Sequence, residues 1–319
     1  MKNNSIQFAV VREDPQIEMD IAENFRLNRA TLIGSGGCTA FCLKALRPEM
    51  EIVLIEPNAA QIELIKEKIQ SLKSDEKKIL FGKFGIENSG QDRLIERGNF
   101  ESLFRQFRLF IREFIASEIE IENAFIKNTP QFWTEVFAHP YWKVAFELFF
   151  SDAILTAMFT EAAIQHAPRN SYPAYFRKVL EKGLLRKDAS RNYFLHHIFT
   201  GNYLNDENAL PYYLVNPPTN LDFEFFNGFA QDYRQFRGRQ LVHFSNIFDW
   251  CDERTVVEII NSATGNLEKG SVVVVRQLNN DKNYREMFGS DFRWLPTESI
   301  VENDRSLFYS KIEIGEKIL

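Results

Sequence analysis

The chain has 319 residues, of which 14% are aromatic, and its 38 Lys and Arg against 44 Asp and Glu give a net charge of -6. The acidic balance argues against a nucleic-acid partner bound on a basic face, and 30 Phe beside 15 Gly and 11 Pro exclude a disordered or collagen-like chain. The length allows one large or two ordinary domains with a full core, so the excess of Phe predicts thick helical packing or an apolar pocket.

Residues 30–81 alternate short apolar runs with helical segments, which is the βαβ pattern of a parallel sheet. In chain order we expect a strand at residues 31–33, a glycine turn at 34–37, a helix at 38–46, a strand at 52–55, a helix at 59–72 and a short strand at 79–81. Pro48 stops the first helix, and Glu56 directly follows the second strand.

Residues 86–233 lose this alternation and are predicted to be helical, with breaks at several prolines. Five phenylalanines recur at spacings of four, three, three and four residues, which places them on one helix face: Phe100, Phe104, Phe107, Phe110 and Phe114. We interpret this stripe as the core of a helical insertion, with a ligand-lining face as the alternative.

The sheet pattern returns toward the end of the sequence, with strands expected at residues 240–244, 271–275 and 306–314 and a helix at 253–262. We therefore predict an α/β fold, a Rossmann-like doubly wound sheet with a large helical insertion. Residues 1–85 and 235–319 form its discontinuous ligand-binding domain, and residues 86–234 form the insertion that caps it.

The glycine turn and Glu56 together indicate an adenosine-containing ligand. A glycine turn before a helix lets the backbone approach a ligand closely, and a carboxylate 20 residues beyond Gly36, at a strand end, can accept both hydroxyls of a ribose. The dinucleotide fingerprint is incomplete because Thr39 stands where its third glycine belongs. The incomplete fingerprint favours S-adenosylmethionine over a nicotinamide dinucleotide as the ligand. The alternative is that the glycine turn binds no ligand and is a purely structural loop.

Several motifs occur in the order found in one family: Arg12-Glu13-Asp14-Pro15, Ile33-Gly34-Ser35-Gly36-Gly37, Glu56-Pro57-Asn58 followed by Gln61 and Leu64, residues 191–197, Gly201-Asn202-Tyr203, residues 211–214, and Ser245-Asn246-Ile247-Phe248-Asp249-Trp250. Over residues 9–315 the chain resembles the S-adenosylmethionine:diacylglycerol 3-amino-3-carboxypropyl transferases of betaine-lipid synthesis. It is shorter than the lipid-forming members, and Glu56 stands where many of them have Asp.

The resemblance implies a transferase that moves the 3-amino-3-carboxypropyl group of S-adenosylmethionine to a hydroxyl or amine and releases methylthioadenosine. The acceptor would be diacylglycerol or a smaller apolar molecule, bound by the insertion at residues 86–234. The second interpretation is a methyltransferase on the same scaffold. Both reactions use S-adenosylmethionine, and they differ in which of its carbons the bound pose presents to the acceptor. A non-catalytic cofactor- or lipid-binding protein is the third.

Four residues of the glycine turn are expected to cradle the amino-acid and ribose parts of S-adenosylmethionine: Gly34, Ser35, Gly36 and Gly37. Glu56, with Pro57 beside it, is expected to bind the ribose. Glu13 and Asp14 are expected to hold the ammonium group, with Asp14 as the N-cap of a following helix as the alternative. Arg276, which ends an apolar strand, either binds a carboxylate of the ligand or pairs with an acidic side chain of the chain itself.

The segment at residues 246–250 follows a predicted strand, and ligands of open α/β sheets bind at the carboxyl ends of strands. Asn246, Ile247 and Asp249 are therefore expected to face the sulfonium or the acceptor. Asp249 is a candidate general base, or else the N-cap of the next helix. Trp250 either stacks on the ligand or packs in the core.

The insertion offers further candidate bases in His196 and His197, with the Tyr193 hydroxyl as a third candidate catalytic group nearby. Histidines in such apolar surroundings more often have a structural role, which is the alternative for both. If they are catalytic, the stripe of Phe rings is the wall of an acceptor pocket.

Three cysteines, Cys38, Cys42 and Cys251, lack the spacing of metal ligands, so we expect no metal and a reduced, cytoplasmic protein. The richest apolar stretch, residues 144–164, contains Glu147, Asp152 and Glu161, and so predicts no transmembrane helix. Peripheral membrane contact stays open, although no basic amphipathic segment favours it. The sequence predicts no oligomeric state.

Overall fold

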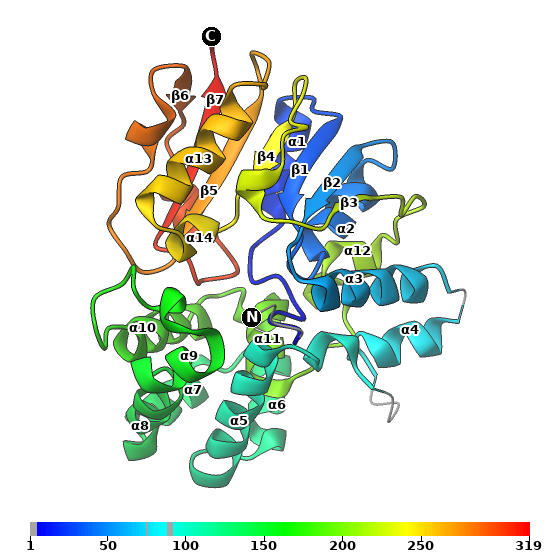
Figure 1. The fold of residues 1–319 in the computed structure, drawn as a ribbon. Helices are drawn as coiled ribbons and strands as arrows, with labels where there is room; N and C mark the ends of the chain where they lie inside the picture. Colours follow the sequence, from blue (N-terminus) through cyan, green and yellow to red (C-terminus); the bar gives the residue numbers. More distant parts are fainter. Residues whose placement is uncertain (1–4, 75, 88–91) are drawn as a thin grey trace.

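The computed structural model describes residues 5–74, 76–87 and 92–319. Its strands are β1 (Arg29–Ile33), β2 (Glu51–Ile55), β3 (Glu224–Phe226), β4 (Leu241–His243), β5 (Val272–Gln277), β6 (Phe292–Trp294) and β7 (Lys311–Lys317). They form one sheet in the order β3-β2-β1-β4-β5-β7-β6 (Figure 1). The five strands from β3 to β5 are parallel, and β7 runs antiparallel to β5 and β6. The expectation of a mostly parallel α/β fold is confirmed.

The two strands and two helices predicted between residues 31 and 72 are present, with the strands beginning one or two residues earlier than expected. Helix α2 (Cys38–Leu46) follows β1 through the glycine turn, and α3 (Ala59–Leu72) follows β2. Asn58 caps α3, because its side-chain oxygen accepts a hydrogen bond from the backbone N–H of Ala60 at 3.0 Å. The left-handed conformation of Gly37, with φ at 79°, explains a glycine immediately before α2.

Alternating side chains of the strands bury both faces of the sheet. In β5, Val272 and Val274 pack with α2 and with α1 (Gln16–Asn24) on one face. Val273 and Val275 pack on the other face with α13 (Glu253–Thr264). This doubly wound arrangement leaves the carboxyl edge of the parallel strands open to other parts of the chain.

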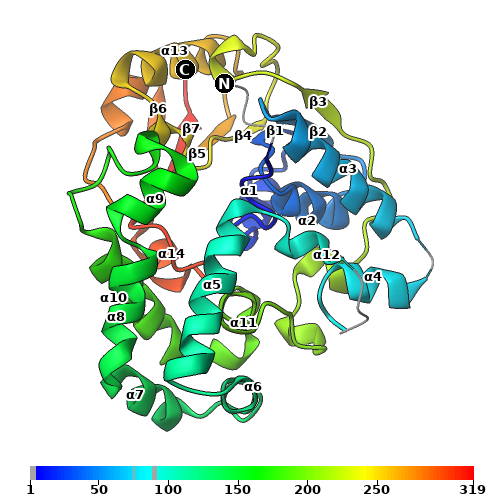
Figure 2. The same cartoon turned by 60° about the horizontal axis from the view of Figure 1, so that its bottom comes forward.

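The helical part has a hydrophobic core of its own. Its helices are α5 (Asn99–Phe114), α6 (Glu118–Ile126), α7 (Pro130–Ala138), α8 (Pro140–Phe149), α9 (Asp152–Phe159), α10 (Tyr172–Leu184) and α11 (Tyr193–Thr200) (Figure 2). In the stripe of α5, Phe104 and Phe107 are fully buried in this core, whereas Phe114 is 47% exposed. Core packing, rather than a ligand-lining face, therefore accounts for most of the stripe.

Three predicted elements differ from the structure. Residues 79–81, expected as a strand, lie inside helix α4 (Lys77–Lys83), which packs on α3. Residues 224–226, expected in the helical insertion, form β3 and pair with β2. The chain therefore returns to the sheet before residue 234, where the insertion was predicted to end. The last strand begins at Lys311 rather than Ser306, because Leu307 has a φ of 69° that an extended strand does not tolerate.

The remaining helices are short. Helix α12 (Tyr212–Val215) packs on α2, and α14 (Glu298–Asn303) packs on β7. Tyr213 and Leu214 of α12 belong to the core beneath the sheet rather than to the core of the helical part. The second part of the expected insertion thus returns to the α/β body before the chain enters β3.

Candidate functional site

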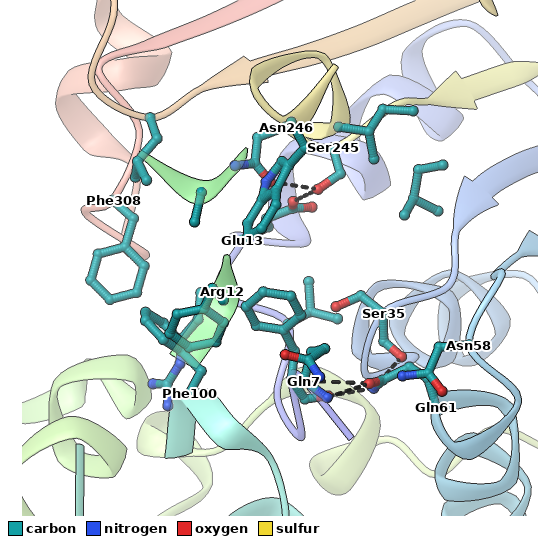
Figure 3. A pocket seen from close by; sticks show the side chains of 18 of the residues that line it. Gln7, Arg12, Glu13, Ser35, Asn58, Gln61, Phe100, Ser245, Asn246 and Phe308 are labelled. Carbon is teal, nitrogen blue, oxygen red and sulfur yellow. Dashed lines mark hydrogen bonds between the residues drawn. The ribbon is translucent and has the colours of Figure 1, made fainter. Parts of the chain in front are cut away.

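A cavity of about 530 Å³ lies between the carboxyl ends of β1, β2 and β4 and the helices α5, α9 and α10 (Figure 3). Polar side chains from the strand ends and the N-terminal segment line one part of it, including Glu13, Ser35, Glu56, Asn58, Ser245 and Asn246. Apolar side chains line the rest, including Phe100, Leu155, Phe159, Phe176, Trp250 and Phe308. The cavity therefore suits a ligand, or a pair of ligands, with one polar and one apolar part.

Glu56 is the carboxylate at the end of β2 in this cavity. Its two oxygens accept hydrogen bonds from the backbone N–H groups of Ser35, at 3.0 Å, and Asn58, at 2.9 Å. Burial raises the pKa of Glu56 to about 7, although both N–H groups favour the ionised form. A carboxylate has about four acceptor positions, so two remain for hydroxyl groups of a ligand.

The glycine turn itself is covered by the N-terminal segment, and of its four residues only Ser35 lines the cavity. Lys68, which is fully buried, donates a hydrogen bond to the carbonyl of Gly36 at 2.8 Å and another to the carbonyl of Ala9. This corrects the expectation that Gly34, Gly36 and Gly37 contact the ligand. The glycine at position 36 allows a close approach of the N-terminal segment, not of a ligand, to the turn.

Replacing Gly36 with Ala is expected to lower the free energy of unfolding by about 1–3 kcal/mol, since overpacking a fitted site has this cost. The added Cβ would lie 2.7 Å from the carbonyl oxygen of Ala9, a backbone atom that cannot move without displacing the N-terminal segment. Urea denaturation measures the change. Gly265→Ala is the matched control: Gly265 has a helical φ of -62° and no contact for an added Cβ closer than 3.3 Å, so its stability should stay within about 1 kcal/mol of wild type.

Glu13 reaches the cavity from the N-terminal segment. Its carboxylate accepts hydrogen bonds from the hydroxyls of Ser245 and Tyr309, the latter at 3.2 Å, and lies 2.8 Å from Nε2 of His243. Burial would raise the pKa of Glu13, but His243, Arg276 and these hydrogen bonds outweigh it and hold the pKa at about 2. Glu13 is therefore expected to be ionised, with its charge partly balanced by Arg276 at 3.7 Å.

Asp14 and Arg276, both expected to contact the ligand, do not line the cavity. The guanidinium of Arg276 is fully buried and binds both carboxylate oxygens of Glu18, at 2.7 and 3.1 Å. Asp14 binds Arg305 and accepts a hydrogen bond from the backbone N–H of Gln16 at the start of α1. The alternative of a pair within the chain therefore describes Arg276. Asp14 pairs with Arg305 instead of binding a ligand, and the N-cap expected at Asp14 is Pro15 in the structure.

Of the strand-end cluster, Asn246, Ile247 and Trp250 line the cavity, as does Pro57 beside Glu56. Asp249 does not: it is fully buried and accepts hydrogen bonds from the backbone N–H of Leu278, at 2.9 Å, and from two side chains, Asn280 and Tyr284. Nor does it cap α13, whose N-cap is Asp252. This corrects the expectation that Asp249 touches the substrate.

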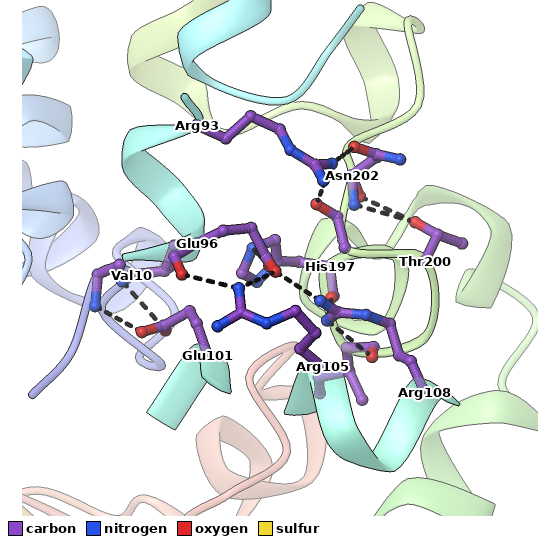
Figure 4. Close-up of polar contacts among 12 residues, drawn as sticks. Val10, Arg93, Glu96, Glu101, Arg105, Arg108, His197, Thr200 and Asn202 are labelled. Carbon is purple, nitrogen blue, oxygen red and sulfur yellow. Dashed lines mark hydrogen bonds and ion pairs between the residues drawn. The ribbon is translucent and has the colours of Figure 1, made fainter. Parts of the chain in front are cut away.

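The candidate bases of the insertion lie outside the cavity. His197 is buried beside Glu96, whose carboxylate lies 3.0 Å from Nε2 (Figure 4). A guanidinium nitrogen of Arg12 lies 2.8 Å from its Nδ1. His196 packs against the ring of Phe125. Burial is the main cause that lowers the pKa of each histidine to about 4. Both therefore have the structural role.

Tyr193 is also buried outside the cavity, with its ring 4.2 Å from that of Phe194. Burial raises its pKa well above the ordinary value. The expectation of a catalytic role for Tyr193 is corrected for the same reason as for the two histidines. Helix α11 is packed on every side, and all eight of its residues are buried.

Several cavity residues were not predicted from the sequence. Phe8, Gln61, Tyr172 and Tyr309 all line the cavity. Gln61 has a local signal, since it stands one helical turn after Asn58 on the face that meets the glycine turn, where its amide donates to the carbonyl of Ser35 at 2.7 Å. The other three reach the cavity only through tertiary packing, and no pattern in the sequence marks them.

Comparisons with protein-family models, with curated proteins and with solved structures find no match for this chain. Within residues 5–74, 76–87 and 92–319, no group of three or more His, Cys, Asp or Glu side chains is arranged to hold a metal ion. None of the helices in those ranges is long and apolar enough to cross a membrane.

Proposed function

We propose that the protein is an S-adenosylmethionine-dependent transferase that moves the 3-amino-3-carboxypropyl group to a hydroxyl or amine of an apolar acceptor and releases methylthioadenosine. One observation carries the proposal: the cavity holds Glu56 between two backbone N–H groups at the carboxyl edge of a parallel sheet, with the ionised Glu13 in the same wall and aromatic side chains opposite. Ligands of doubly wound sheets bind at this edge.

The polar residues fit the donor substrate group by group. Glu56 has acceptor positions left for the two ribose hydroxyls, as a ribose-binding acid requires. The carboxylate of Glu13 suits a cationic partner, either the ammonium or the sulfonium. Trp250 and Pro57 offer apolar surface for the adenine.

The reaction needs positioning more than acid-base power. The acceptor oxygen or nitrogen attacks the γ-carbon of the methionyl chain, the carbon–sulfur bond breaks, and the sulfonium leaves as the neutral thioether of methylthioadenosine. A cavity that holds both reactants side by side converts this step into an intramolecular one, which lowers the barrier by several kcal/mol. The aromatic wall from Phe100, Phe159 and Phe308 would hold the acceptor and exclude water.

The identity of the spent donor tests the proposal. We expect that incubation with S-adenosylmethionine and either 1,2-dioctanoylglycerol or octylamine releases methylthioadenosine, measured by mass spectrometry, together with the acceptor extended by the aminocarboxypropyl group. S-adenosylhomocysteine in its place would show a methyltransferase. Binding of the donor without any product from either acceptor would show a binding protein.

Replacing Glu13 with Gln is expected to weaken the binding of S-adenosylmethionine about 30-fold, which corresponds to the loss of a charged hydrogen bond worth about 2 kcal/mol. Methylthioadenosine lacks the ammonium and the sulfonium, so its affinity should stay within about threefold of wild type. Isothermal calorimetry with both ligands makes the comparison. Equal losses for the two ligands would contradict the assignment of Glu13 to the cationic part of the donor.

A further inference from the structure

A tyrosine and a histidine from the helical part meet Asp249 behind the cavity wall. His166 lies in the segment between α9 and α10 and is 8% exposed. Its Nε2 is 2.6 Å from the hydroxyl of Tyr172, the first residue of α10, and Tyr172 lines the cavity. The same Nε2 lies 4.0 Å from a carboxylate oxygen of Asp249. Three titratable groups thus follow one another from the cavity into the interior.

The surroundings of His166 leave it free to take up a proton. Its Nε2 lies at hydrogen-bond distance from the hydroxyl of Tyr172, which can pass a proton on and which is also 3.3 Å from the carbonyl oxygen of Ala163. The charged and titratable groups around it are Asp249, Tyr172 and Lys282. Burial, the main influence, lowers the pKa of His166 below its ordinary value, while Asp249 opposes this shift.

The other acid-base groups near the cavity are less suited to accept a proton from an acceptor. His197 and His243 each lie within 3 Å of a guanidinium nitrogen, which cannot pass a proton on at neutral pH. Glu13 has a pKa of about 2 and is a weak base. Of these three histidines, His166 is the one whose bonded partner is a neutral hydroxyl of a residue that lines the cavity.

We infer that Tyr172 and His166 form a proton relay for a hydroxyl acceptor, with Asp249 as the charge partner of the imidazolium that results. The inference rests on the proposed transfer reaction. As the acceptor oxygen forms its bond to the γ-carbon, its proton passes to the Tyr172 oxygen and the Tyr172 proton passes to Nε2 of His166. The products are the ether, neutral methylthioadenosine and protonated His166, so charge and protons balance. The proton later leaves to solvent.

Two variants separate this role from packing. His166→Gln keeps an oxygen that can accept the Tyr172 hydrogen but cannot take up a proton, and Tyr172→Phe keeps the ring, which stacks on Phe176. We expect both to lower kcat with 1,2-dioctanoylglycerol about 100-fold, at the lower end of what a general base contributes. Both should bind methylthioadenosine as wild type does. Tyr141→Phe, at an exposed tyrosine of α8, is the matched control and should leave kcat unchanged.

The acceptor and the pH supply two readouts that a structural role would not move. A neutral amine attacks before it must lose a proton, so at about pH 10, where much of the octylamine is unprotonated, its kcat should fall less than tenfold in both variants. With the glycerol acceptor and saturating donor, the kcat of wild type should decrease at acidic pH, as His166 becomes protonated before the reaction. His166→Gln should lack this decrease.

The outcomes are distinct. If wild type releases no methylthioadenosine with either acceptor, the proposed function is wrong and the relay with it. If wild type is active but His166→Gln keeps its rate and its pH profile with 1,2-dioctanoylglycerol, the relay alone is wrong. If neither variant melts cooperatively, the profile of wild type decides, because a kcat that stays flat as the pH is lowered, until the protein begins to unfold, would overturn the relay.

Discussion

The Arg276→Met variant is expected to lose about 3–5 kcal/mol of unfolding free energy at about pH 8, which is the cost of removing one partner from a buried ion pair. Arg276 is fully buried, and its guanidinium binds Glu18, which is also fully buried, at 2.7 Å. It lies 3.7 Å from Glu13 as well. Methionine fills a similar volume but leaves two carboxylates in the interior without their cation.

The pH dependence identifies the cause of this loss. Without the guanidinium, less opposes the effect of burial, so the pKa of Glu13, about 2 in the wild type, is expected to rise above its unfolded value. The folded variant then binds more protons than the unfolded chain, so its stability relative to wild type should fall as the pH rises from about 5 to about 8. Subtracting the unfolding free energy of wild type at each pH cancels the contribution of the titratable groups that the substitution leaves unchanged.

A surface pair provides the control. Arg293 binds Glu316 at the sheet edge, but its side chain is 64% exposed, and exposed pairs contribute less than about 1 kcal/mol. Arg293→Met should therefore leave the unfolding curve nearly unchanged at every pH. If Arg276→Met and Arg293→Met lose equal amounts, Arg276 is not the cation that balances the buried carboxylates. Urea denaturation at two pH values makes all the comparisons.

The elements around the glycine turn could be predicted because their signals are local. Residues 38–46 and 59–72 carry a helical pattern with a glycine before the first and a capping Asn before the second, and the structure has both helices with the same bounds. Residues 79–81 show the limit of this reasoning. Three apolar residues fit a strand or a helix equally, and packing on α3 decided for the helix.

The site was harder to predict than the fold, because burial and partners depend on distant parts of the chain. Arg276 ends an apolar strand as a ligand-binding arginine would, and only the position of Glu18, 258 residues away, shows that it is already paired. His196 and His197 are good bases by residue type, yet helix α11 is enclosed on all sides. Glu56 was placed by local reasoning, since a strand end and the turn beside it are both visible in the sequence.

Replacing Glu56 with Gln is expected to weaken methylthioadenosine and S-adenosylmethionine equally, about 100-fold at about pH 8, because both ligands carry the ribose and two hydrogen bonds to a charged acceptor are worth nearly 3 kcal/mol. The expectation follows from the carboxylate's place between the N–H groups of Ser35 and Asn58. Glu63→Gln, at an exposed acid of α3 that pairs with Lys66, is the matched control and should change neither affinity.

The raised pKa gives this prediction a second readout. Ribose hydroxyls donate to the ionised carboxylate, and Glu56 has a pKa of about 7, so wild type should bind methylthioadenosine about tenfold more weakly at pH 6 than at pH 8. The Gln variant cannot titrate at this position, and its affinity should be the same at both pH values. Isothermal calorimetry measures both. Two results would contradict the assignment: a wild-type affinity that does not change with pH, or a Gln variant that binds as tightly as wild type. Either result would place the ribose elsewhere in the cavity, and Glu56 would then only join β2 to the glycine turn.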